Sequence, residues 1–289
     1  MTGTSVLVVN PFASRVDERR IVAVARELAV DEVLRTEHPG HATELARSLV
    51  DVSAIYVFSG DGGFNEVLNG SDGRVPLGFL PGGGTSVLPR ALGLPRDPVR
   101  AARVLAGARP RRISLGRVNG RRFGFGAGLG LDAELVRRVD ALGRDHSGRR
   151  AGDVRFVLTA LRLLAERRVR FEPVLEIEGH GRAAFALVAN TDPYSYAGPL
   201  PLRLARGARF EAGLDLVAPR SFHARDLPGA ARYLLTARTG ISLILLHDQD
   251  RIVVRCDIPT PLQADGEDLG DVTEAVFEAE RDAVTVLAP

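Results

Sequence analysis

The stretch FSGDGGFNEVLNG, at Phe58–Gly70, decides the fold because it joins a predicted strand to a predicted helix through a glycine-rich turn. The preceding run AIYVFS, at Ala54–Ser59, is typical of a buried strand, and helical spacing begins at Phe64. A glycine turn at the carboxyl end of a parallel strand lets a ligand approach the backbone closely. The helix behind it offers unpaired N–H groups and its positive dipole end. The residues Ser59-Gly60-Asp61-Gly62-Gly63 therefore form a predicted phosphate-binding turn.

Asp61 does not fit a simple phosphate cradle, because a carboxylate beside phosphates repels them. It fits if its side chain holds a magnesium ion or accepts a proton from an attacking hydroxyl. The polar residues Asn65, Glu66 and Asn69 follow within the predicted helix. The turn is therefore predicted to take part in chemistry on a phosphate as well as binding it.

A second glycine turn, PGGGTS at Pro81–Ser86, also lies between a predicted strand (Pro76–Leu80) and a predicted helix (Ser86–Leu92). Two such turns after neighbouring strands would face one crevice. Neither carries the Lys-Ser/Thr of a P-loop, and neither is a G-x-G-x-x-G after the first strand. Tight connections without a ligand are the alternative, and the presence of two turns together favours a nucleotide site.

Strands and helices alternate through the first part of the chain, from a strand at Ser5–Asn10 to a helix at Pro98–Ala106. This alternation predicts a Rossmann-like, three-layer α/β domain with a parallel sheet, over residues 1–111. After Arg111 the pattern changes to a hairpin around Asn119-Gly120, two helices and then mostly strands. Residues 112–289 therefore form a predicted second domain, mainly antiparallel, and the last strand is expected to return to the first domain. The arginine-rich stretch Arg144–Arg155 is predicted to be an exposed loop.

The composition is that of an ordinary soluble protein of 289 residues, with 45% hydrophobic and 26% charged residues. The single cysteine, Cys256, excludes a disulfide framework and argues against a cysteine metal site. A formal net charge of +2 does not indicate a nucleic-acid partner, and every cation available to a phosphate is an arginine. With no signal peptide and no apolar run of membrane-spanning length in the sequence, no transmembrane segment and a cytoplasmic location are expected.

These motifs resemble the catalytic domain of the diacylglycerol kinases. The matching segments are SGDGGFNEVLNG, PGGGTSVLPRALGLP, the opening VVNPFAS and the late DGE at Asp265–Glu267, in the same order over nearly the whole chain. The group includes bacterial lipid kinases, sphingosine kinases and, more remotely, NAD kinase. The resemblance implies an α/β nucleotide domain, a C-terminal β-sandwich and ATP in the cleft between them. It also implies Mg²⁺, a lipid acceptor at the inner membrane face and a homodimer.

The resemblance further assigns roles to individual residues. Glu267 is implied as proton acceptor, with Asp265 beside it and Asp61 as the other candidate. Asp132 is similar to an acidic position near the acceptor's head group, although a lone aspartate opening a helix is also an ordinary N-cap. The implied nucleotide contacts are Asn10, Thr36, Ser59, Gly60, Asp61, Gly62, Gly63, Asn65, Glu66, Gly83, Gly84 and Thr85.

The sequence departs from the family pattern at three places. The usual loop is GGDGT, whereas here Ser59 replaces the first glycine and Gly63 replaces the threonine. Val87-Leu88 stand where an Asn-Asp pair is usual, which removes a carboxylate from the site. Many relatives bind a structural magnesium at an Asp-Gly-Leu segment, and here Ala212-Gly213-Leu214 is followed by Asp215. The metal candidates are therefore Asp61 and Asp215.

Several further residues and one predicted helix allow two interpretations. Tyr194 and Tyr196 are predicted in a loop that could close over the site or contact lipid. His38 and His41 are predicted at a surface loop and helix start, and His247 in a polar turn. The amphipathic helix Val154–Val169 suits either a membrane interface or core packing.

The functional hypothesis is a lipid kinase that transfers the γ-phosphate of ATP to a lipid hydroxyl, of diacylglycerol or a related lipid. One alternative is a soluble nucleotide kinase similar to NAD kinase. The other is a nucleotide-binding protein that has lost catalysis, suggested by Gly63 and by Val87-Leu88.

Overall fold

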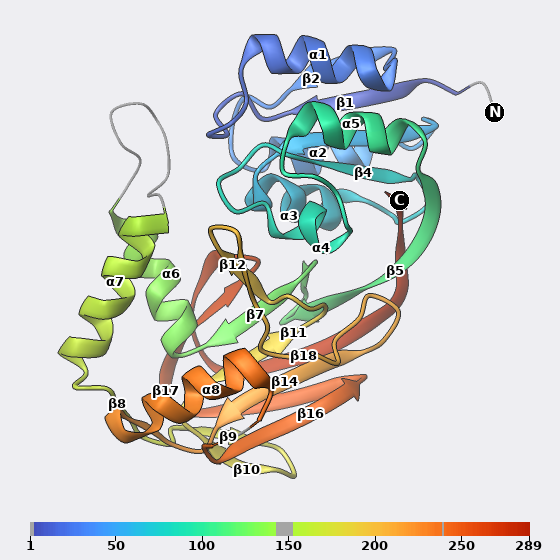
Figure 1. The fold of residues 1–289 in the computed structure, drawn as a ribbon. Coiled ribbons are helices and arrows are strands. Elements are labelled where there is room, and N and C mark those ends of the chain that lie inside the picture. Colours follow the sequence, from blue (N-terminus) through green and yellow to red (C-terminus); the bar gives the residue numbers. More distant parts are fainter. Residues whose placement is uncertain (1–2, 143–152, 239) are drawn as a thin grey trace. The chain divides into compact units, whose positions relative to one another are not determined.

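The computed structural model describes residues 3–142, 153–238 and 240–289, and the chain separates into two compact units. The first consists of Met1–Leu115 and Arg281–Pro289, and the second of Gly116–Glu280. Two long strands, β5 (Arg109–Val118) and β18 (Glu267–Ala288), carry the chain from one unit into the other. The expected combination of an α/β part and a mainly antiparallel part is confirmed (Figure 1).

The first unit is built on a parallel sheet in the order β2-β1-β3-β4, and the end of β18 pairs in parallel with β4 through Val286 and Leu77. The elements are β1 (Ser5–Val9), α1 (Glu18–Leu28), β2 (Glu32–Arg35), α2 (His41–Ser48), β3 (Ala54–Ser59), α3 (Asp61–Gly70), β4 (Leu77–Pro81), α4 (Val87–Ala91) and α5 (Pro98–Ala106).

Side-chain alternation along the strands separates two helical layers. Leu7, Tyr56 and Phe58 pack into one core cluster with residues of α1 and α5. On the opposite face, the ring of Phe64 on α3 meets Phe79 edge-on, with centroids 5.3 Å apart. This is the three-layer arrangement that strand–helix alternation predicts.

The second unit contains an antiparallel sheet in the order β16-β14-β11-β7-β17-β18. β9 pairs with β17 and β10. β6 forms a hairpin with β5, and the two turn residues, Asn119 and Gly120, have left-handed backbone conformations. The strands are β6 (Arg121–Phe123), β7 (Gly126–Leu129), β9 (Leu175–Ile177), β10 (Gly181–Ala183), β11 (Ala186–Ala189), β14 (Leu214–Pro219), β16 (Leu243–Gln249) and β17 (Arg251–Ala264), with the short pairs β8–β15 and β12–β13 (Arg170–Phe171 with Phe222–His223, Ser195–Ala197 with Leu200–Leu202). The helices are α6 (Leu131–Ala141), α7 (Asp153–Glu166) and α8 (Leu227–Thr236).

Several sequence-predicted boundaries change in the structure. α3 begins at Asp61 rather than Phe64, because Gly60 acts as its N-cap and the Asp-Gly-Gly segment forms its first turn. His247 lies in β16 and not in a polar turn. The strands predicted at Glu274–Ala279 and Ala283–Leu287 are parts of the single strand β18. Of the predicted arginine-rich loop Arg144–Arg155, residues up to 152 lie outside the described residues. Its last three residues are helical, because α7 begins at Asp153.

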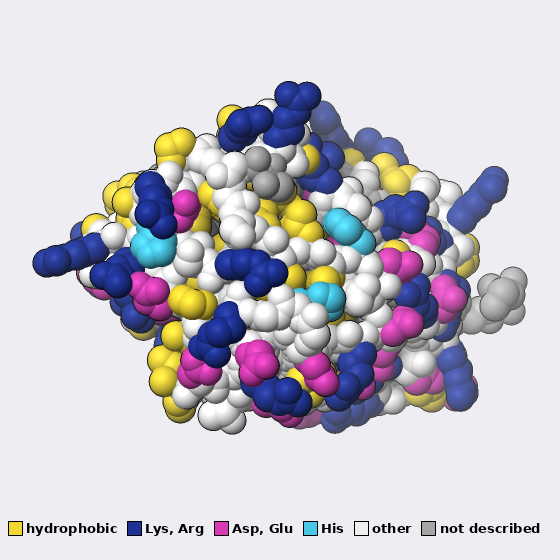
Figure 2. All heavy atoms as spheres, turned by 90° about the horizontal axis from the view of Figure 1, so that it is seen from below, with side chains coloured by type: hydrophobic (Ala, Val, Ile, Leu, Met, Phe, Trp, Pro, Cys, Tyr) yellow, Lys and Arg dark blue, Asp and Glu magenta, His cyan; other side chains and the backbone are white. Residues whose placement is uncertain are grey.

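The surface carries both signs of charge. On the face drawn in Figure 2, arginine and acidic side chains are interspersed, with small groups of hydrophobic side chains between them. This mixture agrees with the formal net charge of +2. In the part of the chain that the structure describes, no helix is long and apolar enough to span a bilayer.

Candidate active site

The two predicted glycine turns lie against each other in the first unit. Ser59 at the end of β3 is paired with Pro81 at the end of β4, and the Gly82 N–H donates to the Ser59 carbonyl oxygen at 2.7 Å. A Cβ atom added to Gly83 would lie 2.9 Å from the Gly60 Cα. The backbones of the two turns therefore meet in a way that requires glycine at position 83.

Asp61 joins the two turns through its side chain. Its Oδ1 accepts a hydrogen bond from the Val87 N–H at 2.7 Å, at the start of α4. A carboxylate at a helix start satisfies an otherwise unpaired N–H group. Val87 and Leu88, which replace the expected polar pair, are 2% and 1% exposed. Asp61 therefore has a structural role that the motif alone did not reveal.

The start of α3 can receive an anion. The helix has ten residues, its N-cap Gly60 makes no side-chain capping bond, and the first N–H groups of a helix have no partner within the helix. Gly62 and Gly63 carry no side chain there. On the other turn, a Cβ added to Gly84 would meet nothing within 4 Å. A phosphate group fits this combination of N–H donors and open backbone.

Asn10 and Thr36 lie at the same edge of the sheet, at the carboxyl ends of β1 and β2. The Asn10 N–H donates to the Phe58 carbonyl oxygen at 3.0 Å, and the Thr36 N–H donates to Val9 at 2.9 Å. The Asn10 Oδ1 accepts from the Phe12 N–H at 2.9 Å. The structure therefore brings the residues of four neighbouring strand ends to one edge, as parallel pairing requires.

Glu66 and Asn65 have contacts that explain them without a ligand. The Glu66 Oε2 accepts from the Ala42 N–H at 3.1 Å, and the Glu66 carbonyl oxygen accepts from the Thr43 hydroxyl at 2.9 Å. Glu66 thereby caps α2, whose N-cap Gly40 has no side chain. Asn65 is fully buried and accepts from the Asn69 side-chain amide.

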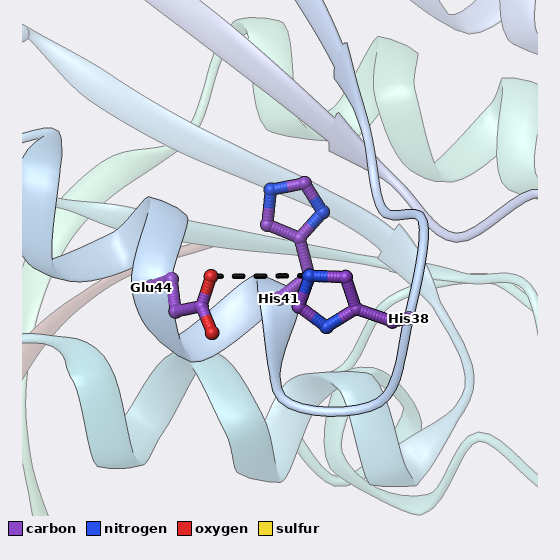
Figure 3. A group of neighbouring side chains, drawn as sticks. All are labelled: His38, His41 and Glu44. Carbon is purple, nitrogen blue, oxygen red and sulfur yellow. Dashed lines mark ion pairs between the residues drawn. The ribbon is translucent and has the colours of Figure 1, made fainter.

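The imidazoles of His38, which is exposed, and His41, which is half-buried, form a stacked pair beside Glu44 (Figure 3). Their rings are 4.7 Å apart and inclined by 7°, and the His41 Nδ1 accepts from the Glu37 N–H at 3.1 Å. Ring lone pairs lie in the ring plane, so stacked parallel rings do not direct them at one ion. The group fits the predicted surface loop and helix start, since α2 begins at His41.

In the second unit, Asp132 is the centre of a buried polar cluster. Its Oδ2 accepts from the Tyr194 hydroxyl at 2.6 Å and from the Gln263 side-chain amide at 2.5 Å. Burial raises the pKa of Asp132, and the two hydrogen bonds oppose that change. Burial also raises the pKa of Tyr194 well above its usual range, so this phenol stays a neutral donor. Tyr194 is 7% exposed and belongs to the core, which a lid residue would not.

The carboxylates of the Asp265-Gly266-Glu267 turn have different surroundings. Asp265 is buried, and its oxygens accept from the N–H groups of Gly124, Phe125 and Gly126 at 2.6, 3.0 and 3.2 Å. Glu267 pairs with the Arg121 guanidinium at 2.5 Å. The Gln263 Oε1 accepts from the Gly266 N–H at 2.9 Å and so links this turn to Asp132. Asp265 therefore anchors the turn, and Glu267 is the more accessible carboxylate of the two.

Asp215 does not fit a metal ligand in this structure. Its side chain is 3% exposed, its Oδ1 accepts from the Asp248 N–H at 3.0 Å, and its Oδ2 lies 3.0 Å from the His247 Nδ1. Both oxygens thus already have donors from the protein. The His247 imidazole occupies the place beside the carboxylate that an ion would need.

Comparison with known proteins gives a family model for the first part of the chain. Residues 4–118 match the family model described as the diacylglycerol kinase catalytic domain. The diacylglycerol kinase of Bacillus subtilis is 40% identical over 103 residues, which is 34% of each protein, so the chain spans about a third of the length of this curated relative.

Solved structures extend the likeness to the whole fold. A crystal structure of a diacylglycerol kinase from Bacillus anthracis aligns over 99% of this chain and 97% of that one, with a TM-score of 0.72 and 19% identity. An NAD kinase from Archaeoglobus fulgidus, solved in complex with ATP, aligns over 98% and 93%, with a TM-score of 0.51 and 14% identity. These two likenesses show the fold.

Asp132→Asn should raise the thermal stability of the protein at neutral pH. Burial favours the protonated form of Asp132, so its stabilising contribution is complete below the ordinary value of 3.8 and is lost as pH rises through the raised pKa. The amide keeps an oxygen for Tyr194 and Gln263, and we expect a gain of about 2–5 °C in Tm at pH 8.

Thermal unfolding of the wild type, Asp132→Asn and the exposed-site control Asp51→Asn across pH 4–8 measures this effect. The gain should grow with pH for the Asp132 variant alone. A gain that does not change with pH would contradict the assignment.

Removal of divalent ions should leave the stability of the second unit unchanged. Because Asp215 is held by His247 and Asp248, excess EDTA and added Mg²⁺ should give the same Tm without nucleotide. His247→Ala should lower the free energy of unfolding by about 1 kcal/mol, since it takes one donor from a buried carboxylate. His180→Ala, at an exposed position, is the matched control. If EDTA lowered the Tm of the wild type but not that of Asp215→Asn, this would show that an ion binds at Asp215.

Proposed function

Residues 4–118 belong to the diacylglycerol kinase catalytic domain family, and on this premise we propose that the chain transfers the γ-phosphate of ATP to the hydroxyl of a lipid. The observation that carries the proposal is the contact between the two glycine turns at the ends of β3 and β4, with the start of α3 behind them. Phosphoryl transfer depends mainly on positioning and charge stabilisation. Backbone N–H groups on open glycine turns provide both.

Asp61 is the proposed link between phosphate binding and chemistry. Magnesium prefers carboxylate oxygens as ligands, and when bound it would offset the negative charge of the phosphates. Asp61 fits as such a ligand because the Val87 N–H holds its Oδ1 and fixes the orientation of the carboxylate. Asp61 keeps its place beside the turns in this way without a bound nucleotide.

The proton of the attacking hydroxyl goes to Glu267 or Asp61 in this proposal. Asp265 is the poorer acceptor, because its oxygens already accept from backbone N–H groups that hold the turn together. Arg121 pairs with Glu267, and both side chains remain partly exposed. A partly exposed carboxylate can take up a proton at a lower structural cost than a buried one that holds several backbone N–H groups.

The acceptor is proposed to meet Asp132. The described hydrogen bonds of its carboxylate all go to Oδ2, from Tyr194 and Gln263, so Oδ1 is left for a hydroxyl group of the acceptor. The membrane surface is the proposed place of reaction. Leu158 and Leu161 on α7 are 50% and 57% exposed, as suits an interfacial helix, whereas Leu163 on the same helix is fully buried.

The test is transfer of label from ATP in the presence of Mg²⁺ and a total lipid extract, with NAD as acceptor in a parallel reaction. Label in an organic-phase product supports a lipid kinase. Label on NAD alone supports a soluble nucleotide kinase, whose fold this chain shares. Binding of ATP without transfer to either acceptor supports a nucleotide-binding protein without catalysis.

Glu267→Gln and Asp61→Asn separate the two proposed proton acceptors. The variant that removes the acceptor should lower kcat by about 10²–10⁴-fold. Glu267→Gln should leave the Kd for ATP within about threefold, whereas Asp61→Asn also changes the proposed magnesium ligand and should weaken ATP binding. Both amides keep hydrogen-bonding oxygens, so the fold should survive. Glu274→Gln, on the same strand as Glu267 but with an exposed side chain, is the control. Full activity in both test variants would refute both assignments.

A further inference from the structure

Gln263 lies near the end of β17, two residues before the Asp265-Gly266-Glu267 turn, and it is 3% exposed. Both polar atoms of its amide have partners. The Oε1 accepts from the Gly266 N–H at 2.9 Å, and the Nε2 donates to the Asp132 Oδ2 at 2.5 Å and to the Tyr194 hydroxyl at 3.0 Å. A buried amide with partners at both atoms is held in one orientation.

Asp132 determines which way round this amide lies. Its Oδ2 acts as an acceptor, because the Tyr194 hydroxyl and the Gln263 Nε2 both donate to it. The Gly266 N–H can only donate. If the amide were reversed, Oε1 would face a carboxylate oxygen and Nε2 would face an N–H group, and both hydrogen bonds would be lost. Asp132 therefore keeps the amide oxygen of Gln263 toward the turn.

The place of the Asp132 carboxylate depends on glycine in β7. Gln263 and Gly128 are partners in the pairing of β17 with β7. A Cβ atom added to Gly128 would lie 2.4 Å from the Asp132 Oδ2, and one added to Gly126 would lie 2.6 Å from the Tyr194 ring. Asp132, which reaches in from α6, therefore occupies the space that a cross-strand side chain would fill.

The Gly266 N–H needs a partner because of the shape of the turn. Asp265 and Gly266 both have left-handed backbone conformations, and β17 and β18 pair on either side of them. The hydrogen bond across such a turn joins its first and fourth residues, so the two central N–H groups have no partner within the hairpin. Here the Asp265 N–H donates to the Gly126 carbonyl oxygen at 2.8 Å, and the Gly266 N–H donates to Gln263. These two bonds fix the backbone that leads into Glu267.

We propose that Gln263 is a positioning residue for the Asp265-Gly266-Glu267 turn, and that Asp132 acts on the turn through it. Asp132 sets the orientation of Gln263, Gln263 holds the Gly266 N–H, and the turn then holds the Glu267 carboxylate in the geometry that proton transfer needs. Asp132 thereby has a role besides its proposed contact with the acceptor. The proposal rests on the proposed function, because Glu267 acts as a proton acceptor only there.

Hydrogen exchange of the Gly266 amide tests these contacts without nucleotide or lipid. Asp132→Leu removes the acceptor for Gln263, so Gly266 should exchange at least about tenfold faster, although Asp132 reaches it only through Gln263. Asp132→Asn keeps an acceptor oxygen and should retain the wild-type rate. Ile244→Ala, which weakens the core at β16 in the same unit, should also leave Gly266 unchanged. Equal rates in Asp132→Leu and the wild type, or faster exchange in the Ile244 control as well, would overturn the proposal.

Gln263→Met tests the effect on catalysis, because it replaces the amide with an apolar side chain of similar length. We expect kcat to fall by about 10–100-fold and the Kd for ATP to stay within about threefold, since only the turn is displaced. In the Glu267→Gln background, the same change should lower kcat by less than about twofold, because a residue that acts through Glu267 has nothing left to position. Leu262→Met, at the neighbouring buried position, is the matched control and should keep kcat. An equal loss in both backgrounds would refute the positioning role.

The two measurements separate this proposal from the proposed function. If the wild type transfers phosphate to no acceptor, the proposed function is refuted, and with it the part of Gln263 in catalysis. The exchange rates would still decide whether Asp132 orients Gln263. If the wild type is active and Glu267→Gln keeps full activity, the proposed function stands with Asp61 as proton acceptor, and the positioning role is refuted.

Discussion

The contact between Gly60 and Gly83 is the constraint on which the first unit depends. A side chain on Gly83 would push apart the ends of β3 and β4, which pair from Ile55 to Ser59. With no side chain at position 83, the two βα turns close on each other, and the helices that follow begin at one edge of the sheet. The edge is therefore formed from backbone N–H groups, which a phosphate can reach, rather than from side chains.

The acidic residues of the motif stabilise the helices around this edge. Asp61 holds the first N–H of α4, and Glu66 holds the Ala42 N–H of α2. Neither helix has a side-chain cap of its own, because their N-caps are Ser86 in left-handed conformation and Gly40. One helix, α3, thus supplies caps to two neighbours, so a mutation in its first two turns affects the positions of three helix starts.

Much of this was predictable from the sequence, for identifiable reasons. The alternation of strands and helices predicted the parallel sheet, and the Asn119-Gly120 dipeptide predicted the hairpin. Both could be predicted because each depends on residues close together in the sequence. The start of α3 at Asp61 was missed, since a first turn of Asp-Gly-Gly has no apolar periodicity. The contact of Gln263 with Asp132, the burial of Tyr194 against Asp132 and the pairing of Asp215 with His247 could not be predicted, because each joins residues whose distance is set only by the folded chain.

In the second unit, the role of a carboxylate follows from the hydrogen-bond donors around it rather than from the sequence motif that contains it. Asp265 and Glu267 are two residues apart, yet Asp265 accepts from three backbone N–H groups whereas Glu267 has the Arg121 guanidinium. Protonation of Asp265 would weaken the bonds that fix residues Gly124 to Gly126, and β7 begins at the last of these. Glu267 is partly exposed, and the turn stays anchored by Asp265 and by the bond from Gly266 to Gln263. The buried aspartate therefore keeps the turn in place independently of the ion pair between Glu267 and Arg121.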